Sequence, residues 1–412
     1  MATSNREAQD KSYRFWKSKP VIKYGTKPVT SNKILDAKTV RTKYGTDVET
    51  TLIDGYRWMT IDVASDEFEN SGVIEFINNN ISNQYVTHVT ADRIRWEVNG
   101  SGTFICAVHN DTIAGCVCIC CKTLQINDST QNVCESSYLY VSPDLRGTGL
   151  VKVIINEAIR RAVNTGCDVG SFCTDRIIPS PVATIRYYTR PLNYKYLKAN
   201  DFVSVGEVDD DVAHDRIKIK LRPPKSVKIA ENTDENVQLV HDLYVESMKS
   251  FNLHHVLSLE EIRHYFFDDR FVQTILYEDE NGDVVDFLTY RYYDIVNTGR
   301  PSNPDDKYGN IIRATAIFAY SSNFFRSDIL VINAFKVISL ARHHLVYIPD
   351  TMSSNEIILS EVKVSDEDTL DEEEHALFDQ HIMKSRKKQF INLFNWSCPL
   401  MTQEMVSYLL FN

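Results

Sequence analysis

The most regular hydrophobic pattern in the chain predicts a strand, a glycine turn and a helix in direct succession. Aromatic and apolar residues over 138–141 fit a short strand, and a turn that contains Gly147 and Gly149 follows it. Apolar residues then recur every three or four positions, which is the period of an amphipathic helix. They are Val151, Ile154, Ile155, Ala158, Ile159, Ala162 and Val163. Gly166 predicts the end of this helix, and a second strand is expected over 169–174.

The remaining pattern predicts two α+β halves separated by a linker. Expected helices cover 74–81, 237–251 and 329–343, and expected strands cover 104–108, 115–126, 272–277, 284–292 and 314–320. Two prolines within 221–225 disfavour regular structure, because proline restricts its own backbone and that of the residue before it. The length of 412 residues also exceeds the usual size of one hydrophobic core. Residues up to about 40 show no clear period and are expected to form an irregular arm.

The glycine turn is the first candidate for chemistry. Gly147 and Gly149 allow the backbone to approach a ligand without a Cβ clash, and the amides at the start of the helix favour an anion. The segment lacks the lysine of a nucleotide P-loop and the third glycine of a dinucleotide fingerprint. The turn therefore predicts a pyrophosphate, with acyl-CoA as the best ligand, while a plain turn without a ligand is the alternative.

Composition and charge narrow the class of protein. The hydrophobic fraction of 43% is ample for buried cores, and a net charge of −11 argues against nucleic acid as the main partner. No run of about 18 apolar residues occurs, so no membrane span is expected. The N-terminus is polar and unlike a signal peptide. Because residue 2 is Ala rather than Gly, the protein is not expected to be myristoylated itself.

The cysteines predict free thiols rather than a metal site or a nucleophile. Nine cysteines without a secretory signal indicate a reducing compartment, so a cytoplasmic location is expected. Cys116, Cys118 and Cys120 alternate along the expected strand, which places them on one face, where thiols behave as small apolar groups. A zinc site would need ligands from two elements at turn-like spacing. No metal is expected, and no nearby histidine argues for an activated thiol.

Six separated blocks of the chain read as motifs. They are Tyr13-Arg14-Phe15-Trp16 with Pro20-Val21, Gly55-Tyr56-Arg57-Trp58, Tyr138-Leu139-Tyr140-Val141, Ile178-Pro179 through to Leu192-Asn193, Asp286-Phe287-Leu288-Thr289, and Asn395-Trp396 with Cys398-Pro399. These blocks are similar, in the same order, to motifs of the glycylpeptide N-myristoyltransferase family. Members of this family move a tetradecanoyl (myristoyl) group from CoA to an N-terminal glycine. The resemblance covers essentially the whole chain.

The resemblance implies an α+β fold of two fused acetyltransferase-like (GNAT-type) halves, each a mixed twisted sheet flanked by helices. Residues 1–222 would bind acyl-CoA, with the arm 1–40 packed over it. Residues 223–412 would build much of the peptide groove and supply the C-terminal carboxylate. The expected partners are myristoyl-CoA as co-substrate and peptides or proteins that begin with glycine, with no nucleic acid and with the enzyme as a monomer.

The resemblance also implies the roles of single residues. The backbone amides of Tyr138 and Leu139 would stabilise the oxyanion, the carboxylate of Asn412 would take the proton from the peptide ammonium, and Thr174 would lie near the incoming amine. The residues expected to contact acyl-CoA are Tyr13, Arg14, Phe15, Trp16, Tyr138, Leu139, Tyr140, Val141, Arg146, Gly147, Thr148, Gly149, Leu150 and Val151.

The chain departs from the family pattern in the glycine turn and at the expected peptide site. The family turn Arg-Ser-Lys-Arg-Val-Ala is replaced by residues 146–151, which lack two phosphate-facing cations. Asparagines 78–80 stand where the family has an acidic loop, and the chain runs one residue past the usual family end. Two hypotheses follow. The first is direct transfer of myristate to an N-terminal glycine. The second is an acyl-CoA-binding protein whose transfer reaction is lost or altered, for example towards a lysine side chain.

Overall fold

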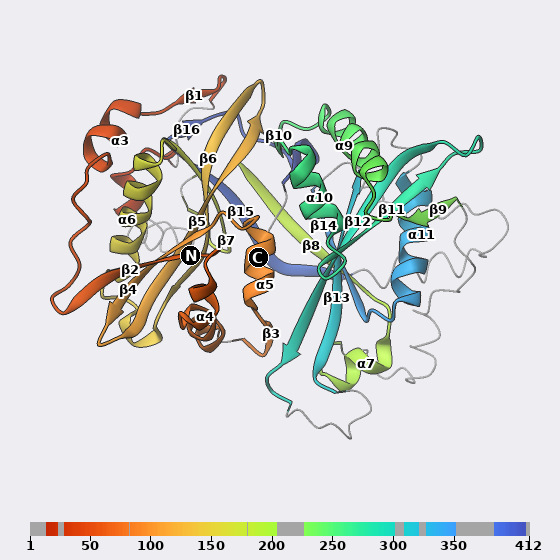
Figure 1. The fold of residues 1–412 in the computed structure, drawn as a ribbon, viewed down its shortest axis with the longest axis horizontal. Helices are drawn as coiled ribbons and strands as arrows, with labels where there is room; N and C mark the ends of the chain where they lie inside the picture. Colours follow the sequence, from red (N-terminus) through yellow and green to blue (C-terminus); the bar gives the residue numbers. More distant parts are fainter. Residues whose placement is uncertain are drawn as a thin grey trace, which may run out of the picture.

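Two halves with the same order of elements lie side by side in this protein (Figure 1). The structure is a computed structural model, and it describes residues 14–23, 29–81, 83–178, 180–203, 226–300, 309–320, 327–351 and 383–408. Within these residues no helix is both long and apolar enough to cross a bilayer.

The first half is a mixed sheet in which only the last two strands are parallel. Its strands are β2 (Tyr56–Asp62), β4 (Thr103–His109), β5 (Thr112–Ile126), β6 (Ser129–Val141) and β7 (Val169–Thr174). Each neighbouring pair from β2 to β6 is antiparallel, whereas β6 and β7 are parallel. A parallel pair needs a crossover connection, and α6 (Leu150–Asn164) provides it.

The second half repeats this arrangement. Its strands are β9 (Val227–Ile229), β11 (Val272–Glu278), β12 (Val284–Asn297), β13 (Ile311–Tyr320) and β14 (Leu345–Pro349). The pairs β9–β11, β11–β12 and β12–β13 are antiparallel, while β13 and β14 are parallel and are connected through α11 (Ser327–Leu340).

The two halves exchange their last strands. β8 (Ala183–Pro191), which follows the first half in sequence, pairs with β14 of the second half. β15 (Met383–Phe394), near the C-terminus, pairs with β7 of the first half, and β8 and β15 also pair with each other. Fifteen of the described strands therefore form one continuous sheet, and the two others, Lys33–Ile34 and Trp396–Ser397, pair separately with each other. The segment 221–225 lies outside the described residues, so the domain boundary at 222 stays a prediction.

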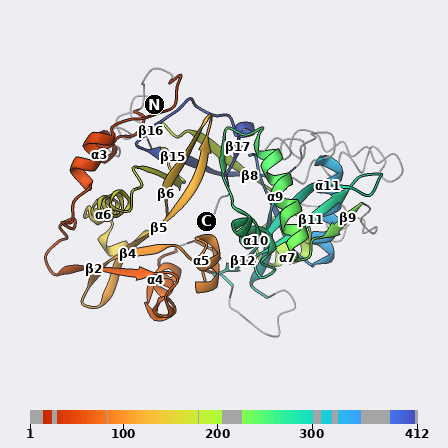
Figure 2. The same ribbon diagram turned by 45° about the horizontal axis from the view of Figure 1, so that its top comes forward.

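The other elements cover the sheet and its ends (Figure 2). The helices are α2 (Arg14–Lys17), α3 (Ala37–Tyr44), α4 (Val73–Asn80), α5 (Ala91–Glu97), α7 (Tyr194–Ala199), α9 (Asp234–Met248) and α10 (Leu259–Phe267). Short 3-10 helices cover Asp66–Asn70, Pro143–Leu145 and Gln403–Met405. The short strands are β1 (Lys33–Ile34), β3 (Tyr85–Thr87), β10 (Leu253–His255), β16 (Trp396–Ser397) and β17 (Val406–Ser407).

Most of the expected helices and strands are confirmed within one to five residues at their ends. The expectation of an irregular arm up to residue 40 is wrong in part, because β1 forms and α3 begins at Ala37. β6 is also longer than the expected 138–141, since it begins at Ser129. Its first four residues, Ser129–Asn132, are all polar, and none of them is buried. Pairing with β5 forms this part of the strand despite that weak local signal.

β5 is buried on both faces, which explains its long apolar run. Cys116, Cys118 and Cys120 lie in a cluster with residues of α4 and α5, which confirms that they share one face. Val117 and Ile119 lie in the cluster on the other face with residues of α6. Burial raises the pKa of Cys120 to about 12, so this thiol stays protonated at neutral pH.

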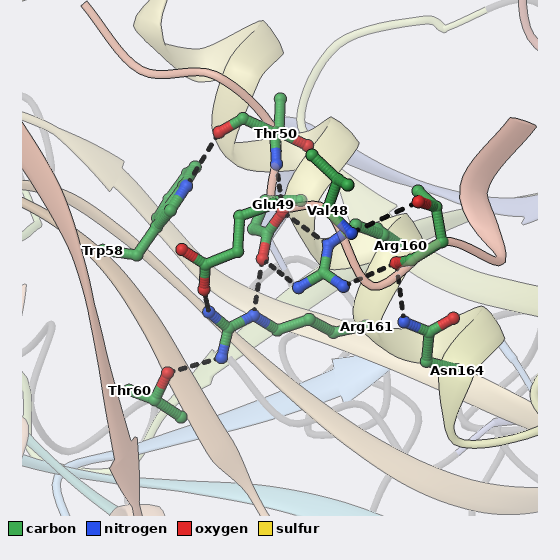
Figure 3. A network of polar contacts seen from close by, with 10 residues as sticks. Val48, Glu49, Thr50, Trp58, Thr60, Arg160, Arg161 and Asn164 are labelled. Carbon is green, nitrogen blue, oxygen red and sulfur yellow. Dashed lines mark hydrogen bonds and ion pairs between the residues drawn. The ribbon is translucent and has the colours of Figure 1, made fainter. Parts of the chain in front are cut away.

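A network of polar contacts joins Arg160 and Arg161 of α6 to the segment before β2 (Figure 3), and a buried carboxylate lies in it. Glu157 has no exposed side-chain surface and accepts two hydrogen bonds from Arg160, at 2.9 and 2.7 Å, and one from Arg161 at 2.8 Å. The backbone amide of Thr50 donates to it at 2.9 Å. Burial alone would raise the pKa of Glu157, but these hydrogen bonds outweigh it and lower the pKa to about 2.

We expect Glu157→Gln to lower the free energy of unfolding by about 3–5 kcal/mol at pH 7, because it removes one charge of a buried ion pair. The folded-state pKa near 2 lies below the value of about 4.3 in an unfolded chain. The stabilisation by Glu157 is therefore complete above about pH 5 and is lost as the pH falls towards 2. Chemical denaturation of both proteins between pH 7 and pH 3 measures the difference.

Glu49→Gln is the matched control, since Glu49 is 54% exposed and contacts Arg161 at 3.2 Å. It should change the free energy of unfolding by about 1 kcal/mol or less. If the difference in the free energy of unfolding between Glu157→Gln and the unsubstituted protein stays constant with pH, the lowered pKa of Glu157 is contradicted.

Candidate functional site

The parallel ladder between β6 and β7 stops before either strand ends. Its last paired residues are Ser136 of β6 and Phe172 of β7. β6 continues to Val141 and β7 to Thr174, so the two strand ends are not paired with each other. β7 remains paired with β15 up to Thr174, which fixes its end in place. The open edge of β6 therefore presents backbone groups that a ligand can hydrogen-bond.

A β-bulge lies on this open stretch of β6. Tyr138 and Leu139 together take the place opposite a single β5 residue, Val117. Tyr138 has a φ of +52°, in the left-handed region that a non-glycine residue adopts only at an energetic cost. Leu139 is 41% exposed although its side chain is large and apolar. The bulge displaces two peptide units from regular pairing with β5, so their amides are suitable donors for a carbonyl oxygen.

A buried ion pair on α5 supports the bulge. The Tyr138 hydroxyl donates a hydrogen bond to the Glu97 carboxylate, and Arg93 Nε donates to the other Glu97 oxygen at 2.8 Å. Arg93 also donates to the Tyr292 carbonyl of β12 at 2.8 Å. Burial, together with the Glu97 charge, raises the pKa of Tyr138 well above its ordinary value, so its hydroxyl remains a donor. The second half thus contacts the bulge through a continuous chain of polar groups.

The turn after β6 presents backbone amides at the start of α6. Gly147 and Gly149 have φ values of +88° and +96°, and a Cβ on either would meet nothing within 4 Å. The Thr148 hydroxyl closes the turn by donating to the Leu145 carbonyl at 2.8 Å. Among the described residues, the amides of Gly147, Gly149 and Val151 have no hydrogen-bond partner. With the positive end of the α6 dipole behind them, these amides can hold an anion.

The N-terminal arm covers the point where β6 and β7 separate. Trp16 stacks on Phe172, with ring centroids 5.3 Å apart and an interplanar angle of 14°. Phe15 packs edge-on against Trp16. Lys19, which is buried, hydrogen-bonds the Asn156 side chain of α6. The arm therefore lies on the sheet face that α6 also covers.

Thr174 ends β7 beside a buried acceptor. Its hydroxyl donates to the Arg176 carbonyl at 2.7 Å and accepts from Asn392 Nδ2 of β15 at 3.3 Å. Asn392 Oδ1 is buried and has no hydrogen-bond partner among the described residues. A buried acceptor without a donor costs free energy. Thr174 and Asn392 therefore form a polar pair that is suited to a ligand N–H group.

The C-terminal segment reaches β6 and β7 from the other sheet face. The Tyr408 hydroxyl donates to the Glu135 carboxylate of β6 and hydrogen-bonds the Ser171 hydroxyl of β7 at 3.1 Å. Glu135 and Ser171 form the ladder pair directly before the last one. Because side chains alternate along a strand, they face away from the side that Trp16 covers. Tyr408 thus attaches the chain to the sheet one residue pair before the strands separate.

Glu135 is a charged acceptor in this arrangement. His255 Nε2 of β10 lies 3.5 Å from its carboxylate. Burial alone would raise the pKa of Glu135, but His255, Lys122 and the Tyr408 hydroxyl outweigh it and lower the pKa. A carboxylate that stays ionised is a stronger acceptor for the Tyr408 hydroxyl than a neutral one.

Comparisons with known proteins show which family this chain resembles. Residues 35–185 match the family described as "Myristoyl-CoA:protein N-myristoyltransferase, N-terminal domain". A similar protein, "Probable glycylpeptide N-tetradecanoyltransferase" of Caenorhabditis elegans, is 25% identical over 313 residues, which cover 69% of this chain and 66% of that protein. "Glycylpeptide N-tetradecanoyltransferase" of Saccharomyces cerevisiae is 24% identical over 314 residues, which cover 70% and 66%. The chain is thus similar to N-myristoyltransferases, both in its N-terminal half and over most of its length.

The matches to N-myristoyltransferases cover less than two thirds of the relatives' own lengths, with 66% of the nematode and yeast proteins and 58% of a Bos taurus relative. One solved structure that the chain resembles is "Crystal Structure of Saccharomyces cerevisiae N-myristoyltransferase with Bound MyristoylCoA". The two have a TM-score of 0.78 at 16% sequence identity, over 95% of this chain and 94% of that chain. This likeness confirms the expected α+β fold with acetyltransferase-like halves.

The structure brings together most of the residues expected at an N-myristoyltransferase acyl-CoA site. Tyr138 and Leu139 form the bulge, the open edge of β6 continues through Tyr140 and Val141, and residues 146–151 form the turn and the start of α6. Phe15 and Trp16 lie over the separation of β6 and β7.

Three expected site residues cannot be placed in full. Tyr13 and Asn412 lie outside the described residues, and so does the side chain of Arg14. Thr174 is described, and its hydroxyl accepts a hydrogen bond from Asn392 of β15. The catalytic and binding roles of all these residues stay predictions.

The sequence analysis does not single out Glu97, Glu135 or Asn392. Glu135 has a detectable signal, since a lone glutamate follows Val133 and Cys134 in a strand that is buried at those positions. Glu97 has Arg93 as a local partner, four positions before it, but its contact with the bulge is made by the distant Tyr138. Asn392 has no such signal, because its partner Thr174 lies far away in sequence.

We expect Tyr408→Phe to lower the free energy of unfolding by about 1–3 kcal/mol, because it leaves the buried Glu135 carboxylate without one of its donors. Tyr196→Phe is the control, since its hydroxyl donates to the Ile311 carbonyl in an exposed setting. The control should cost about 0.5 kcal/mol or less, because water replaces the lost partner at an exposed position. Chemical denaturation measures both, and equal losses would show that Tyr408 is not a significant anchor.

Proposed function

We propose that this protein transfers a myristoyl group from myristoyl-CoA to the amino group of an N-terminal glycine. One observation carries the proposal. The bulge at Tyr138 and Leu139 lies at the open edge of β6, directly before a glycine turn that leads into a helix. This arrangement pairs an anion cradle with backbone donors for a thioester carbonyl, in a chain whose residues 35–185 match the N-terminal domain of N-myristoyltransferases.

In the proposed reaction the amides around Gly147, Gly149 and Val151 hold the pyrophosphate of CoA. The remainder of CoA then runs along the open edge of β6, under Trp16, and the thioester carbonyl accepts hydrogen bonds from the Tyr138 and Leu139 amides. The neutral amine attacks the carbonyl carbon, and the same amides stabilise the oxyanion. The C–S bond then breaks, and the leaving CoA thiolate takes up the proton that the attacking nitrogen loses. Asn392 Oδ1 provides an acceptor for an amide N–H of the bound co-substrate.

We further propose that the Asn412 carboxylate takes the proton from the peptide ammonium, directly or through water. Tyr408 supports this, because it is attached to the sheet next to the separation of β6 and β7. The four residues after Tyr408 can span about 13–14 Å when extended. This exceeds the roughly 10 Å that the strand covers from Glu135, which Tyr408 contacts, to Tyr138 of the bulge. An α-carboxylate is a weak base, and burial would raise its pKa towards the range that proton transfer needs.

A cytoplasmic location is part of the proposal, and the state of the cysteines supports it. All nine are free thiols. Free thiols persist in a reducing compartment.

The second candidate function is acyl-CoA binding with transfer lost or redirected to another amine. The expected peptide site favours this second candidate. The asparagines that replace the family's acidic loop make hydrogen bonds with the protein's own backbone. Asn78 exchanges hydrogen bonds with the Val89 backbone at 2.8 and 2.9 Å, and Asn80 donates to the Phe76 carbonyl at 2.7 Å.

Mass spectrometry after incubation with myristoyl-CoA and a panel of glycine-starting and lysine-containing peptides separates the candidates. We expect a gain of one myristoyl group, about 210 Da, at the N-terminal glycine. Tight acyl-CoA binding without a gain on any peptide would favour the binding protein. A gain confined to lysine side chains would favour the altered acyltransferase.

We expect Gly149→Asn to weaken acyl-CoA binding at least tenfold, about 1.4 kcal/mol. Asn tolerates the left-handed backbone of this position, and its side chain would occupy space that no protein atom fills. Gly166→Asn is a closely matched control, because Gly166 has a φ of +90°, also meets nothing within 4 Å and follows the other end of α6. Calorimetry should show unchanged binding for the control. Equal affinities of the two variants would exclude the turn as the phosphate site.

We expect a short C-terminal extension to lower kcat by about 10²-fold or more and to leave acyl-CoA binding nearly unchanged, because it removes the carboxylate from the end of the chain. Deleting Asn412 is the finer comparison, since it returns the chain to the usual family length with Phe411 as the last residue. Single-turnover rates separate this effect from product release. Full activity of the extended protein would mean that another group accepts the proton.

A further inference from the structure

Two cysteines that the proposed reaction does not use lie in direct contact. Cys121 of β5 and Cys167, between α6 and β7, have their Sγ atoms 3.3 Å apart, although they are 46 positions apart in the sequence. Cys121 is exposed to solvent, whereas Cys167 is buried. A disulfide requires the sulfur atoms to approach to about 2.05 Å, so a modest side-chain adjustment is needed.

The surroundings make Cys121 the most reactive of the described thiols. The pKa of Cys121 is lowered to about 6, mainly by the hydrogen bond from Cys167. A hydrogen bond with Thr165 and the charge of Lys122 also lower this pKa, whereas burial raises it. Burial instead raises the pKa of the other strand cysteines, as at Cys106 and Cys120, where it reaches about 12. The thiolate is the reactive form, and at Cys121 it is also accessible.

We propose that Cys121 and Cys167 form a site of reversible oxidative modification, at which a hydroperoxide converts the two thiols into a disulfide. Three features of the pair carry this: the sulfur contact, the exposure of one thiol and the burial of the other. Cys121 is the residue that reacts with the peroxide, and Cys167 is the residue that resolves the product. The site does not depend on acyl transfer.

The reaction balances in two steps. The Cys121 thiolate attacks one peroxide oxygen, the O–O bond breaks, the other oxygen leaves as alkoxide or hydroxide and takes up a proton, and Cys121 becomes a sulfenic acid. The Cys167 sulfur then attacks the Cys121 sulfur, the S–O bond breaks, and hydroxide leaves with the Cys167 proton as water. The peroxide gains two electrons and the two thiols lose them. A dithiol reductant reverses the result.

The bridge would close a loop that contains the proposed acyl-CoA site. The bulge at Tyr138 and the turn at Gly147 and Gly149 both lie between the two cysteines in sequence. A disulfide across a loop of this length restricts the unfolded chain. We expect it to raise Tm by about 3–6 °C for a protein of this size.

Intact-mass spectrometry of the full chain, before and after a small molar excess of hydrogen peroxide, tests the site. We expect a loss of two hydrogens, about 2 Da, which dithiothreitol restores. Peptide mapping under non-reducing conditions should join Cys121 to Cys167, and the rise in Tm should disappear on reduction.

Three serine variants make the test specific. Cys167→Ser should abolish the bridge and leave Cys121 as a sulfenic acid that dimedone traps. Cys134→Ser is the matched control, because Cys134 is the β5–β6 ladder partner of Cys121 and is the other thiol that could compete. It should leave the bridge intact. Cys398→Ser removes a remote buried thiol and should change nothing.

Two results would overturn the proposal. One is a mass unchanged by peroxide, or one that rises by whole oxygen atoms without any bridge. The other is a bridge that maps to Cys134 instead of Cys167. The Tm of each variant in the reduced state shows whether it is folded. Only variants whose Tm equals that of the unsubstituted protein are used to judge whether the bridge is lost.

Discussion

The separation of β6 from β7 is the constraint on which the rest of the site depends. Parallel strands normally satisfy each other's backbone groups along their whole length, and here pairing ends at Ser136 and Phe172 while both strands continue. The separation is stable because β7 is held on its other side by β15. A strand from the C-terminal part of the chain is thus required to keep a site open in the N-terminal half.

Three buried glutamates stabilise the elements around this separation. Glu97 contacts the bulge, Glu135 contacts the C-terminal segment, and Glu157 fixes α6 to the segment before β2. Each is accompanied by a cation or a hydroxyl donor, which offsets the cost of removing a charge from water. Such contacts add little net stability compared with apolar packing, but they specify one geometry, because each carboxylate must lie within hydrogen-bond distance of its partners.

The exchange of β8 and β15 couples the two halves. Each strand completes the sheet of the other half, and the two also pair together. Arg93 adds a second connection, from α5 to β12. The proposed co-substrate site and the second half are therefore parts of one sheet and one polar network, and a change in one half alters the support of the bulge in the other.

The sequence by itself determined the elements with strong local signals. The glycine turn, the periodicity of α6 and the alternation of Cys116, Cys118 and Cys120 each follow from neighbouring residues, and all three are found in the structure. The resemblance of separated motifs also gave the family and the fold. Only the tertiary structure decided where pairing stops, which strand lies between β7 and β8, and which distant donors meet Glu97 and Glu135. These features depend on contacts between residues far apart in sequence, such as Tyr408 with Glu135, and no local pattern encodes them.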